Sequence, residues 1–448
     1  MTAVIGILNK RGVAIAADSA VTRTRGPRRK KYTKNGNKLL RVSNCVPISV
    51  MITGNADFFS IPWDVIVRRY RQQRGVIGHT SVEECVHDFF GYISKNDIFW
   101  ETKQIHRWIK YTLNNLIEDV KDRMPWEIGI RNNDNKIQKP KTYLKTFVSI
   151  LTKLEKKWLK QGVCPQFEGY SIAQFHQYAH LVIDDFFEQK IKQFDVEDCD
   201  DESDVEIYNL ISSIKGPIEH ALLTRLTTRT TNNATLIFSG YGTEEKYPSL
   251  VAAKVSEGFD NKVNYHISPD DIVKIDEEHP VAICPFAQKD VAKAILRGIH
   301  RGYSADVLHH ISDMYLDIFA NGHCNTSATK DKNENDEIFD DEFYEALNQI
   351  EFDDLKKKFC NSVRRKLDSN QRVWEKALKD YDLQSMASLA GNLINLTGFH
   401  RILTFQQEGV GGPVDLAVIS KTEGFTWLSR KSWYHHKDVN GQYGKFGV

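Results

Sequence analysis

The sequence predicts a mixed α+β fold in which pairs of short apolar strands are separated by longer helical segments. Near the start of the chain, apolar and small residues alternate over 3–8 and 13–17, on either side of a turn at 9–12. Alternation on both sides of a short turn is typical of a β-hairpin. Between 99 and 194, in contrast, apolar residues recur with the spacing of amphipathic helices. The chain therefore contains both strand-rich and helix-rich stretches.

A second pair of strands follows the hairpin. The apolar runs 38–42 and 47–53 have the length of strands, and Gly54 opens a turn before a helical stretch that ends near Gln73. The predicted order is four strands and then a helix, with a glycine turn directly before the helix.

Thr2 and Asp18 carry the first chemical signal. Thr2 precedes the first strand and Asp18 ends the second, so the hairpin brings a hydroxyl near a carboxylate. Removal of Met1 would give Thr2 a free α-amine, a base with a pKa of about 7.7 to 8 that is tethered to the same residue. Thr2 would then supply both nucleophile and base. The alternative is an ordinary hairpin whose second residue happens to be threonine.

Four motifs in this region occur in the order found in a known family. They are Thr2-x-Val4-x-Gly6, Gly12-Val-x-Ile-Ala-Ala-Asp18-Ser-x-x-Thr22, Lys38-Leu-x-x-Val42 and Gly54-x-Ala-Asp57. With these motifs the chain resembles the proteasome β-type subunits and their bacterial relatives among the N-terminal nucleophile (Ntn) hydrolases. The resemblance implies a four-layer αββα sandwich, here with an inserted helical subdomain.

The resemblance also implies roles for individual residues. In the family a threonine attacks a carbonyl, a lysine lowers the effective pKa of its hydroxyl, an aspartate orients the lysine, and amides at a glycine turn hold the oxyanion. The residues at the matching positions are Thr2, Lys38, Asp18 and the turn at Thr53 and Gly54. A lysine charge favours the ionised hydroxyl, and turn amides stabilise developing negative charge.

Two of these assignments leave alternatives open. The same stretch also contains Lys30, Lys31 and Lys34, and Lys38 is preferred because it directly precedes an apolar strand. The oxyanion amide belongs to either Thr53 or Gly54.

The match returns further along the chain. Segments 234–242 and 250–258 are similar to the central strand pair of the family, 281–297 to the next strand and helix, and 409–427 to the terminal strand pair. The departures from the family pattern are Cys284-Pro285-Phe286 in place of a Gly-Ser-Gly turn, Val410 in place of a serine, and Gln406 and Gln407 in place of a supporting aspartate. The core threonine, aspartate and lysine are thus present without the outer polar set.

The matching blocks are separated by insertions. We expect 1–95, 232–320 and 400–448 to form the Ntn core with its basic tail, 96–231 to form a helical insertion, and 321–399 to form an acidic loop and helices. Within the last segment, the polar stretch 325–342 precedes helices expected from Phe343 to about Leu389.

Composition excludes several classes of protein. No stretch of 18 apolar residues and no secretory signal occurs, so neither a membrane span nor export is expected. Seven scattered cysteines argue against a disulfide framework and a zinc site, and they suit the cytoplasm. A net charge of +1 argues against nucleic acid as a partner, so the basic run 23–31 is interpreted as a solvated loop at the rim of the site.

Cofactor sites are not expected either. Gly409, Gly411 and Gly412 precede a strand and not a helix, so they do not form a phosphate loop. His309 and His310 are adjacent and would point about 100° apart on a helix, which makes them a poor metal chelate. We expect no cofactor and no metal.

The predicted function is an N-terminal threonine hydrolase that cleaves amide bonds, in particular peptide bonds, in a homo-oligomer or with related subunits. A separate ATP-dependent unfoldase is a possible partner, because this chain has no nucleotide motif of its own. The alternatives are a catalytically inactive proteasome-like scaffold that keeps Met1 and an amidase that acts on small molecules.

Overall fold

The structure is a computed structural model. It describes residues 2–25, 29–33, 36–124, 140–193, 201–229, 234–298, 310, 352–404 and 410–431. The chain divides into two compact units, each built from more than one segment. The first comprises Met1–Gly36, Ile275–Val418 and Thr426–Val448, and the second comprises Asn37–Lys274 and Ile419–Phe425.

A five-stranded sheet forms the centre of the first unit, with the strand order β13-β1-β2-β14-β15. Its strands are β1 (Ala3–Asn9), β2 (Gly12–Asp18), β13 (Val281–Ala287), β14 (Val414–Ser420) and β15 (Gly424–Ser429). Strand β1 pairs antiparallel with both β2 and β13, and β2 is the central strand. A separate two-stranded hairpin consists of β3 (Val21–Arg25) and β4 (Arg29–Thr33).

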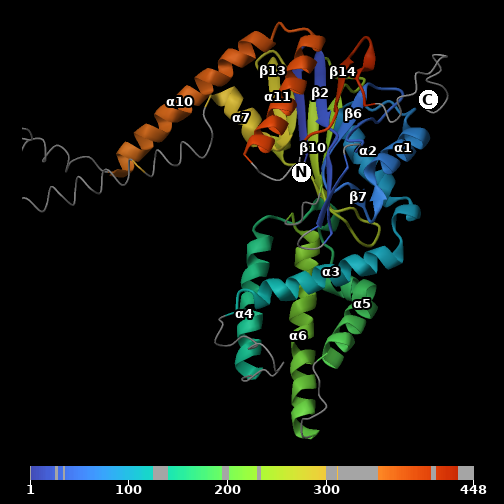
Figure 1. Ribbon diagram of the computed structural model, residues 1–448. Helices are drawn as coiled ribbons and strands as arrows, with labels where there is room; N and C mark the ends of the chain where they lie inside the picture. Colours follow the sequence, from blue (N-terminus) through green and yellow to red (C-terminus); the bar gives the residue numbers. More distant parts are fainter. Residues whose placement is uncertain are drawn as a thin grey trace, which may run out of the picture. The chain divides into compact units, whose positions relative to one another are not determined.

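Three helices belong to the first unit: α7 (Lys289–Arg297), α10 (Phe352–Leu378) and α11 (Leu383–Leu403). Figure 1 shows α11 lying along the face of the sheet beside β2. Asp382 begins α11, because its carboxylate accepts the N–H of Ser385 at 2.6 Å and so satisfies a free donor of the first turn. Gly298 ends α7 with a φ of 75°, a conformation that glycine adopts without strain.

The apolar core of the first unit joins one face of the sheet to these helices. Alternate residues of β1 point to this face and pack against small and branched residues of α11, which allows the helix to approach the sheet closely. The cluster includes Ala3, Ile5, Ile7, Ala14, Ala16, Ala387, Ala390, Leu393 and Ile394. Residues on the opposite face, including Val4, Leu8, Val13 and Ile15, are also fully buried.

A six-stranded sheet forms the centre of the second unit, with β5, β6, β9, β10 and β11 in sequence across it and β12 beside β10. Its strands are β5 (Leu39–Arg41), β6 (Ile48–Gly54), β9 (Ala234–Gly240), β10 (Ser249–Val255), β11 (Tyr265–His266) and β12 (Ile272–Lys274). The short strands β7 (Asp57–Phe58) and β8 (Ile61–Pro62) precede two helices, α1 (Trp63–Arg74) and α2 (Val82–Ser94). Ser81 caps α2 by accepting the N–H of Glu84 at 3.1 Å, and the helix then packs against β9 and β10.

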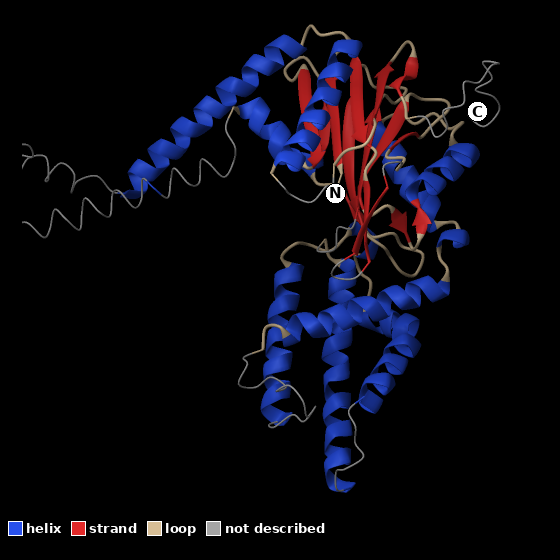
Figure 2. Cartoon of the chain, viewed as in Figure 1, coloured by secondary structure: helices blue, strands red, loops and turns tan. Residues whose placement is uncertain are grey.

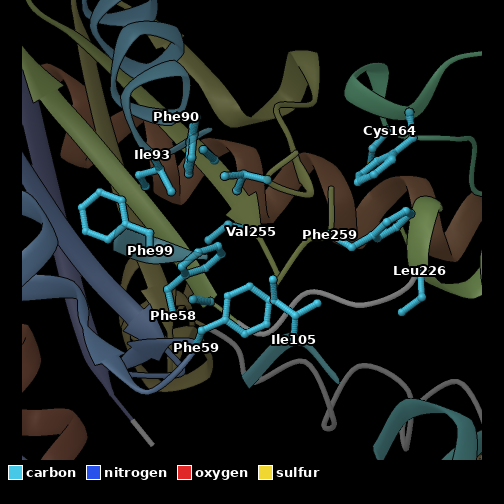
Figure 3. Packing of buried hydrophobic residues seen from close by; sticks show 14 of the residues in the cluster. Phe58, Phe59, Phe90, Ile93, Phe99, Ile105, Cys164, Leu226, Val255 and Phe259 are labelled. Atoms are coloured by element: carbon cyan, nitrogen blue, oxygen red, sulfur yellow. The ribbon is translucent and has the colours of Figure 1, made fainter. Parts of the chain in front are cut away.

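A helical insertion lies between β8 and β9 after these two helices, and Figure 2 shows it as helices and loops. Its elements are η1 (Asp97–Phe99), α3 (Thr102–Lys121), α4 (Pro140–Leu159), η2 (Pro165–Phe167), α5 (Ile172–Gln193) and α6 (Asp201–Thr227), and a further single turn, η3 (Pro269–Asp271), precedes β12. The insertion shares an aromatic core with the sheet of this unit. Figure 3 shows Phe59 beside Ile105 of α3, with Phe58 next to Phe59.

These elements confirm the mixed α+β prediction. The N-terminal hairpin, the strands near 38–54 and the central strand pair are present as expected, and the described parts of 96–231 are mainly helical. Two details differ. The run 23–31 was predicted as a solvated loop, but the structure has the β3–β4 hairpin there, because β-branched Val21, Thr22 and Thr24 favour an extended backbone.

The second difference concerns the end of the helical region near 389. The structure continues α11 to Leu403, because no proline interrupts the stretch and one side of it stays buried as far as Arg401. The acidic stretch 325–342, the first part of the expected helices at 343–351, Gln406, Gln407, His309 and the tail after Lys431 lie outside the described residues.

Candidate active site

Asp18 is fixed to the backbone beside Thr2. The register of β1 and β2 pairs Val4 with Ala17; continued by one residue it sets Ala3 opposite Asp18, and continued by two it sets Thr2 opposite Ser19. The Ala3 N–H donates to Asp18 Oδ1 at 2.9 Å. Asp18 is 1 % exposed and Thr2 8 %. The hairpin therefore holds a buried carboxylate one residue from the threonine, as the sequence predicted.

A second donor reaches Asp18 from a distant part of the chain. The N–H of Gly411 donates to Asp18 Oδ2 at 3.2 Å. The turn that supplies it has φ values of 150° at Gly411 and 79° at Gly412, which favour glycine at both positions. A carboxylate that accepts backbone N–H groups on both oxygens is stabilised in its ionised form.

Val410 has a structural role in this turn. It occupies the position where the resemblance implies a serine, and its side chain is 6 % exposed within the apolar core of the first unit. Cys284 lies in β13 opposite Gly6 of β1. Burial raises the pKa of the Cys284 thiol to about 12, so the thiol is neutral near pH 7 and is not an activated nucleophile.

A buried lysine, Lys431, is linked through Ser19 to the turn that contains Gly411. It was not predicted as a site residue. The ammonium Nζ of Lys431 donates to Asp415 Oδ2 at 2.6 Å, to the carbonyl oxygen of Gly36 at 2.6 Å and to Ser19 Oγ at 3.3 Å. Ser19 Oγ in turn donates to the carbonyl oxygen of Pro413 at 2.6 Å. The Lys431 and Asp415 side chains are 3 % and 4 % exposed. These contacts connect the end of β2 to β14 and to Lys431, two residues after the end of β15.

Lys38 and the glycine turn lie together in the second unit. Lys38 directly precedes β5 and is 6 % exposed, and its carbonyl oxygen accepts the N–H of Ile52 in β6 at 2.8 Å. The register of Leu39 with Met51 sets Lys38 opposite Ile52, next to Thr53. Lys38 and the oxyanion turn predicted from the sequence therefore occupy the same end of the β5–β6 pair.

Thr53 and Gly54 end β6. Thr53 Oγ1 donates to the carbonyl oxygen of Thr235 at 3.4 Å, and Thr53 is 5 % exposed. Gly54 is exposed and has a φ of 83°. A left-handed residue at the end of a strand turns its neighbouring N–H groups out of the sheet, so this turn can present amide donors to a ligand.

The five predicted residues therefore fall into two sets. Thr2 and Asp18 belong to the first unit, and Lys38, Thr53 and Gly54 belong to the second. The alternative lysines Lys30 and Lys31 lie on β4, in the first unit, and Lys34 lies outside the described residues.

Of the residues that were not predicted, one is marked by a signal in the sequence. Ser19 directly follows Asp18 in the family motif, but Asp415 and Lys431 are separated by 16 positions and do not form a recognisable pattern. A lysine four residues after the predicted terminal strand pair is ordinarily solvated, so the burial of Lys431 was not foreseeable.

The described parts of the chain contain neither a metal-ligand cluster nor a helix suited to span a membrane. There, no cluster of three or more His, Cys, Asp or Glu side chains has the arrangement of a metal site. None of the described helices is both long and apolar enough to cross a bilayer. No known protein-family model matches the chain, and the comparison with curated proteins gives no match.

Proposed function

We propose that the chain is an N-terminal threonine hydrolase that cleaves amide bonds, in particular peptide bonds. The observation that carries the proposal is the Asp18 carboxylate, which is buried one residue from Thr2 and accepts N–H groups from Ala3 and Gly411. A buried carboxylate held in place by hydrogen bonds can orient a cation beside the nucleophile. Cleavage of the peptide bond before Thr2 provides the free α-amine.

The proposed reaction has two steps. The α-amine of Thr2 takes the proton from the hydroxyl as Oγ1 attacks the substrate carbonyl, and the amine half of the substrate leaves with that proton. Water then hydrolyses the ester on Thr2. Lys38, oriented by Asp18, stabilises the ionised hydroxyl, and an amide of the Thr53–Gly54 turn stabilises the oxyanion.

This mechanism requires the two sets of residues to meet at Thr2. The αββα sandwich implied by the resemblance would achieve this, with the two sheets packed face to face between helices.

Hydrolysis of fluorogenic peptide amides tests the proposal. Thr2→Ala is expected to lower kcat/KM by at least about 1,000-fold because it removes the nucleophile, while Thr2→Ser retains part of the activity. Lys38→Ala is expected to lower kcat by about 100-fold or more because it removes the stabilising charge. Lys10→Ala is the matched control, since Lys10 is a surface lysine that pairs with Glu277. Unchanged activity in Thr2→Ala protein would refute the mechanism.

A catalytically inactive scaffold is the second candidate. The observation that favours it is Val410, which fills the apolar core where the family has a serine. A scaffold would retain the residue before Thr2, would hydrolyse neither peptides nor small amides, and would still assemble. Activity on small amides without activity on peptides would instead favour an amidase.

The proposal includes an assembly. Subunits of the same or a related kind would enclose the site, and a separate ATP-dependent unfoldase would supply extended substrate. Sedimentation of the purified chain alone tests the first part, because an enclosed site requires more than one subunit.

A further inference from the structure

Lys431 connects the two chain segments that carry the proposed partners of Thr2. Its ammonium donates to Ser19 Oγ, directly after Asp18, and to the carbonyl oxygen of Gly36, two residues before Lys38. The N–H of Gly36 forms a second hydrogen bond, because it donates to the carbonyl oxygen of Ser19 at 2.9 Å. One buried ammonium thus contacts both Ser19, directly after β2, and Gly36, three residues before β5.

Asp415 fixes the ammonium in this position. Asp415 Oδ2 lies 2.6 Å from Lys431 Nζ, and Asp415 Oδ1 accepts the backbone N–H of Lys431 at 2.8 Å. The same carboxylate therefore holds both the main chain and the side chain of Lys431. Asp415, Gly36 and Ser19 provide three acceptors for the three N–H donors of the ammonium, so the buried cation is fully hydrogen-bonded.

The position of the Gly411 turn depends on the same group. Ser19 Oγ accepts from Lys431 and donates to the carbonyl oxygen of Pro413, two residues after Gly411. Gly411 in turn donates to Asp18. Displacement of the ammonium would therefore loosen the turn that supplies the second hydrogen bond to Asp18.

The geometry points to Lys431, held by Asp415, as a positioning residue that fixes the ends of the segments bearing Asp18 and Lys38. This inference rests on the proposed function, in which both residues act on Thr2. Lys431 itself does not touch the nucleophile in this account. Its contribution is to keep the reacting groups in position. A displacement of such groups by about 1 Å costs roughly 100-fold in rate.

The chain offers a variant that separates positioning from folding. Removing one partner of a buried ion pair leaves an uncompensated charge, whereas replacing both partners by apolar residues of similar size leaves none. Lys431→Met/Asp415→Leu is therefore expected to fold and yet to lack the clamp formed by Lys431 and Asp415. Lys431→Arg keeps the charge but has a longer, planar head group, so it is expected to restore only part of the activity.

The measured quantities are the rate constant for acylation of Thr2 by a β-lactone, and kcat and KM for a peptide amide. The double variant is expected to lose about 10- to 100-fold in acylation rate and in kcat, with KM within about twofold of the parent value. Arg430→Met, which removes the neighbouring exposed cation, is expected to behave like the parent protein. Circular dichroism and the thermal midpoint of unfolding verify that each variant is folded at the assay temperature.

Two negative outcomes are distinguishable. If the parent protein reacts at Thr2 and the folded double variant reacts within about twofold of it, Lys431 is not a positioning residue and the proposed function stands. If the parent protein itself neither reacts nor hydrolyses peptides, the proposed function is refuted, and the inference is refuted with it. A double variant that fails to fold contradicts the apolar replacement on which the inference depends.

Discussion

The carboxylate of Asp18 accepts the N–H of Ala3 at 2.9 Å, across the end of the N-terminal hairpin. This bond is not part of the ladder between β1 and β2, since a side chain replaces a main-chain carbonyl as acceptor. It holds the peptide group between Thr2 and Ala3 against a buried negative charge. The direction of the chain at Thr2 therefore depends on Asp18.

Asp18→Asn is expected to destabilise the protein. An amide has one acceptor oxygen and presents an NH₂ group where the second oxygen stood, so the N–H of either Ala3 or Gly411 loses its acceptor. Such a loss costs about 1–3 kcal/mol, which urea-induced unfolding can measure. Asp382→Asn is the matched control, because Asp382 caps α11 at the surface and asparagine caps helices equally well. Equal losses for the two variants would contradict the role assigned to the buried carboxylate.

The ion pair between Lys431 and Asp415 is expected to show strong coupling. Lys431→Met and Asp415→Leu each leave one buried, unpaired charge, and each is expected to lower the free energy of unfolding by about 3–5 kcal/mol. The double variant is expected to lose much less than the sum of the two losses. A double-mutant cycle in urea gives the coupling directly. Additive losses would show that the two side chains contribute independently.

The stability of the second unit is expected to fall between about pH 6.5 and pH 4 through His266. Burial, Lys254 and Arg229 lower the pKa of His266 to about 4. In the unfolded chain His266 has its ordinary pKa of about 6.5, so as the pH falls the unfolded state binds the proton before the folded state does. The free energy of unfolding therefore begins to fall near pH 6.5 and stops falling near pH 4, the pKa of His266 in the folded protein. His266→Leu is expected to flatten this part of the profile relative to His180→Leu, which removes a half-buried histidine of α5. Parallel pH profiles for the two variants would refute the assignment.

Gly240→Ala is expected to damage the pairing of β6 with β9. Gly240 has a φ of 142°, and an added Cβ would lie 1.9 Å from the carbonyl oxygen of Pro47. This oxygen accepts the N–H of Tyr241, so the strand cannot move away without breaking that bond. We expect a loss of at least about 2 kcal/mol in the free energy of unfolding. Gly91→Ala is the matched control, because open space surrounds its Cβ position on α2. Similar unfolding midpoints for both variants would contradict this account.

Much of the fold follows from short-range patterns. The N-terminal hairpin was predictable because alternation over β1 and β2 flanks a four-residue turn, and the helical insertion was predictable from apolar spacing. The β3–β4 hairpin was missed because its arginines and lysines resemble a solvated loop, although its β-branched residues favour strands. The predicted helices end near Leu389, whereas α11 continues to Leu403. Charge pattern and capping give no stop signal before Thr404, so neither marks the true end of the helix.

The candidate site was predictable only where its residues are close in sequence. Thr2 and Asp18 are neighbours in one hairpin, so the register alone brings them together. The contacts of Asp18 with Gly411 and of Lys431 with Ser19 connect residues that are about 400 positions apart. Contacts of that kind depend on tertiary packing, which no local pattern in a single sequence reveals.

Intact mass spectrometry of the purified chain, before and after treatment with an epoxyketone that reacts with N-terminal threonine, tests the central claim most directly. The account predicts an N-terminus at Thr2 and one adduct per chain, mapped to Thr2 and absent from the Thr2→Ala variant. A chain that keeps the residue before Thr2 and forms no adduct would contradict the account and favour the scaffold.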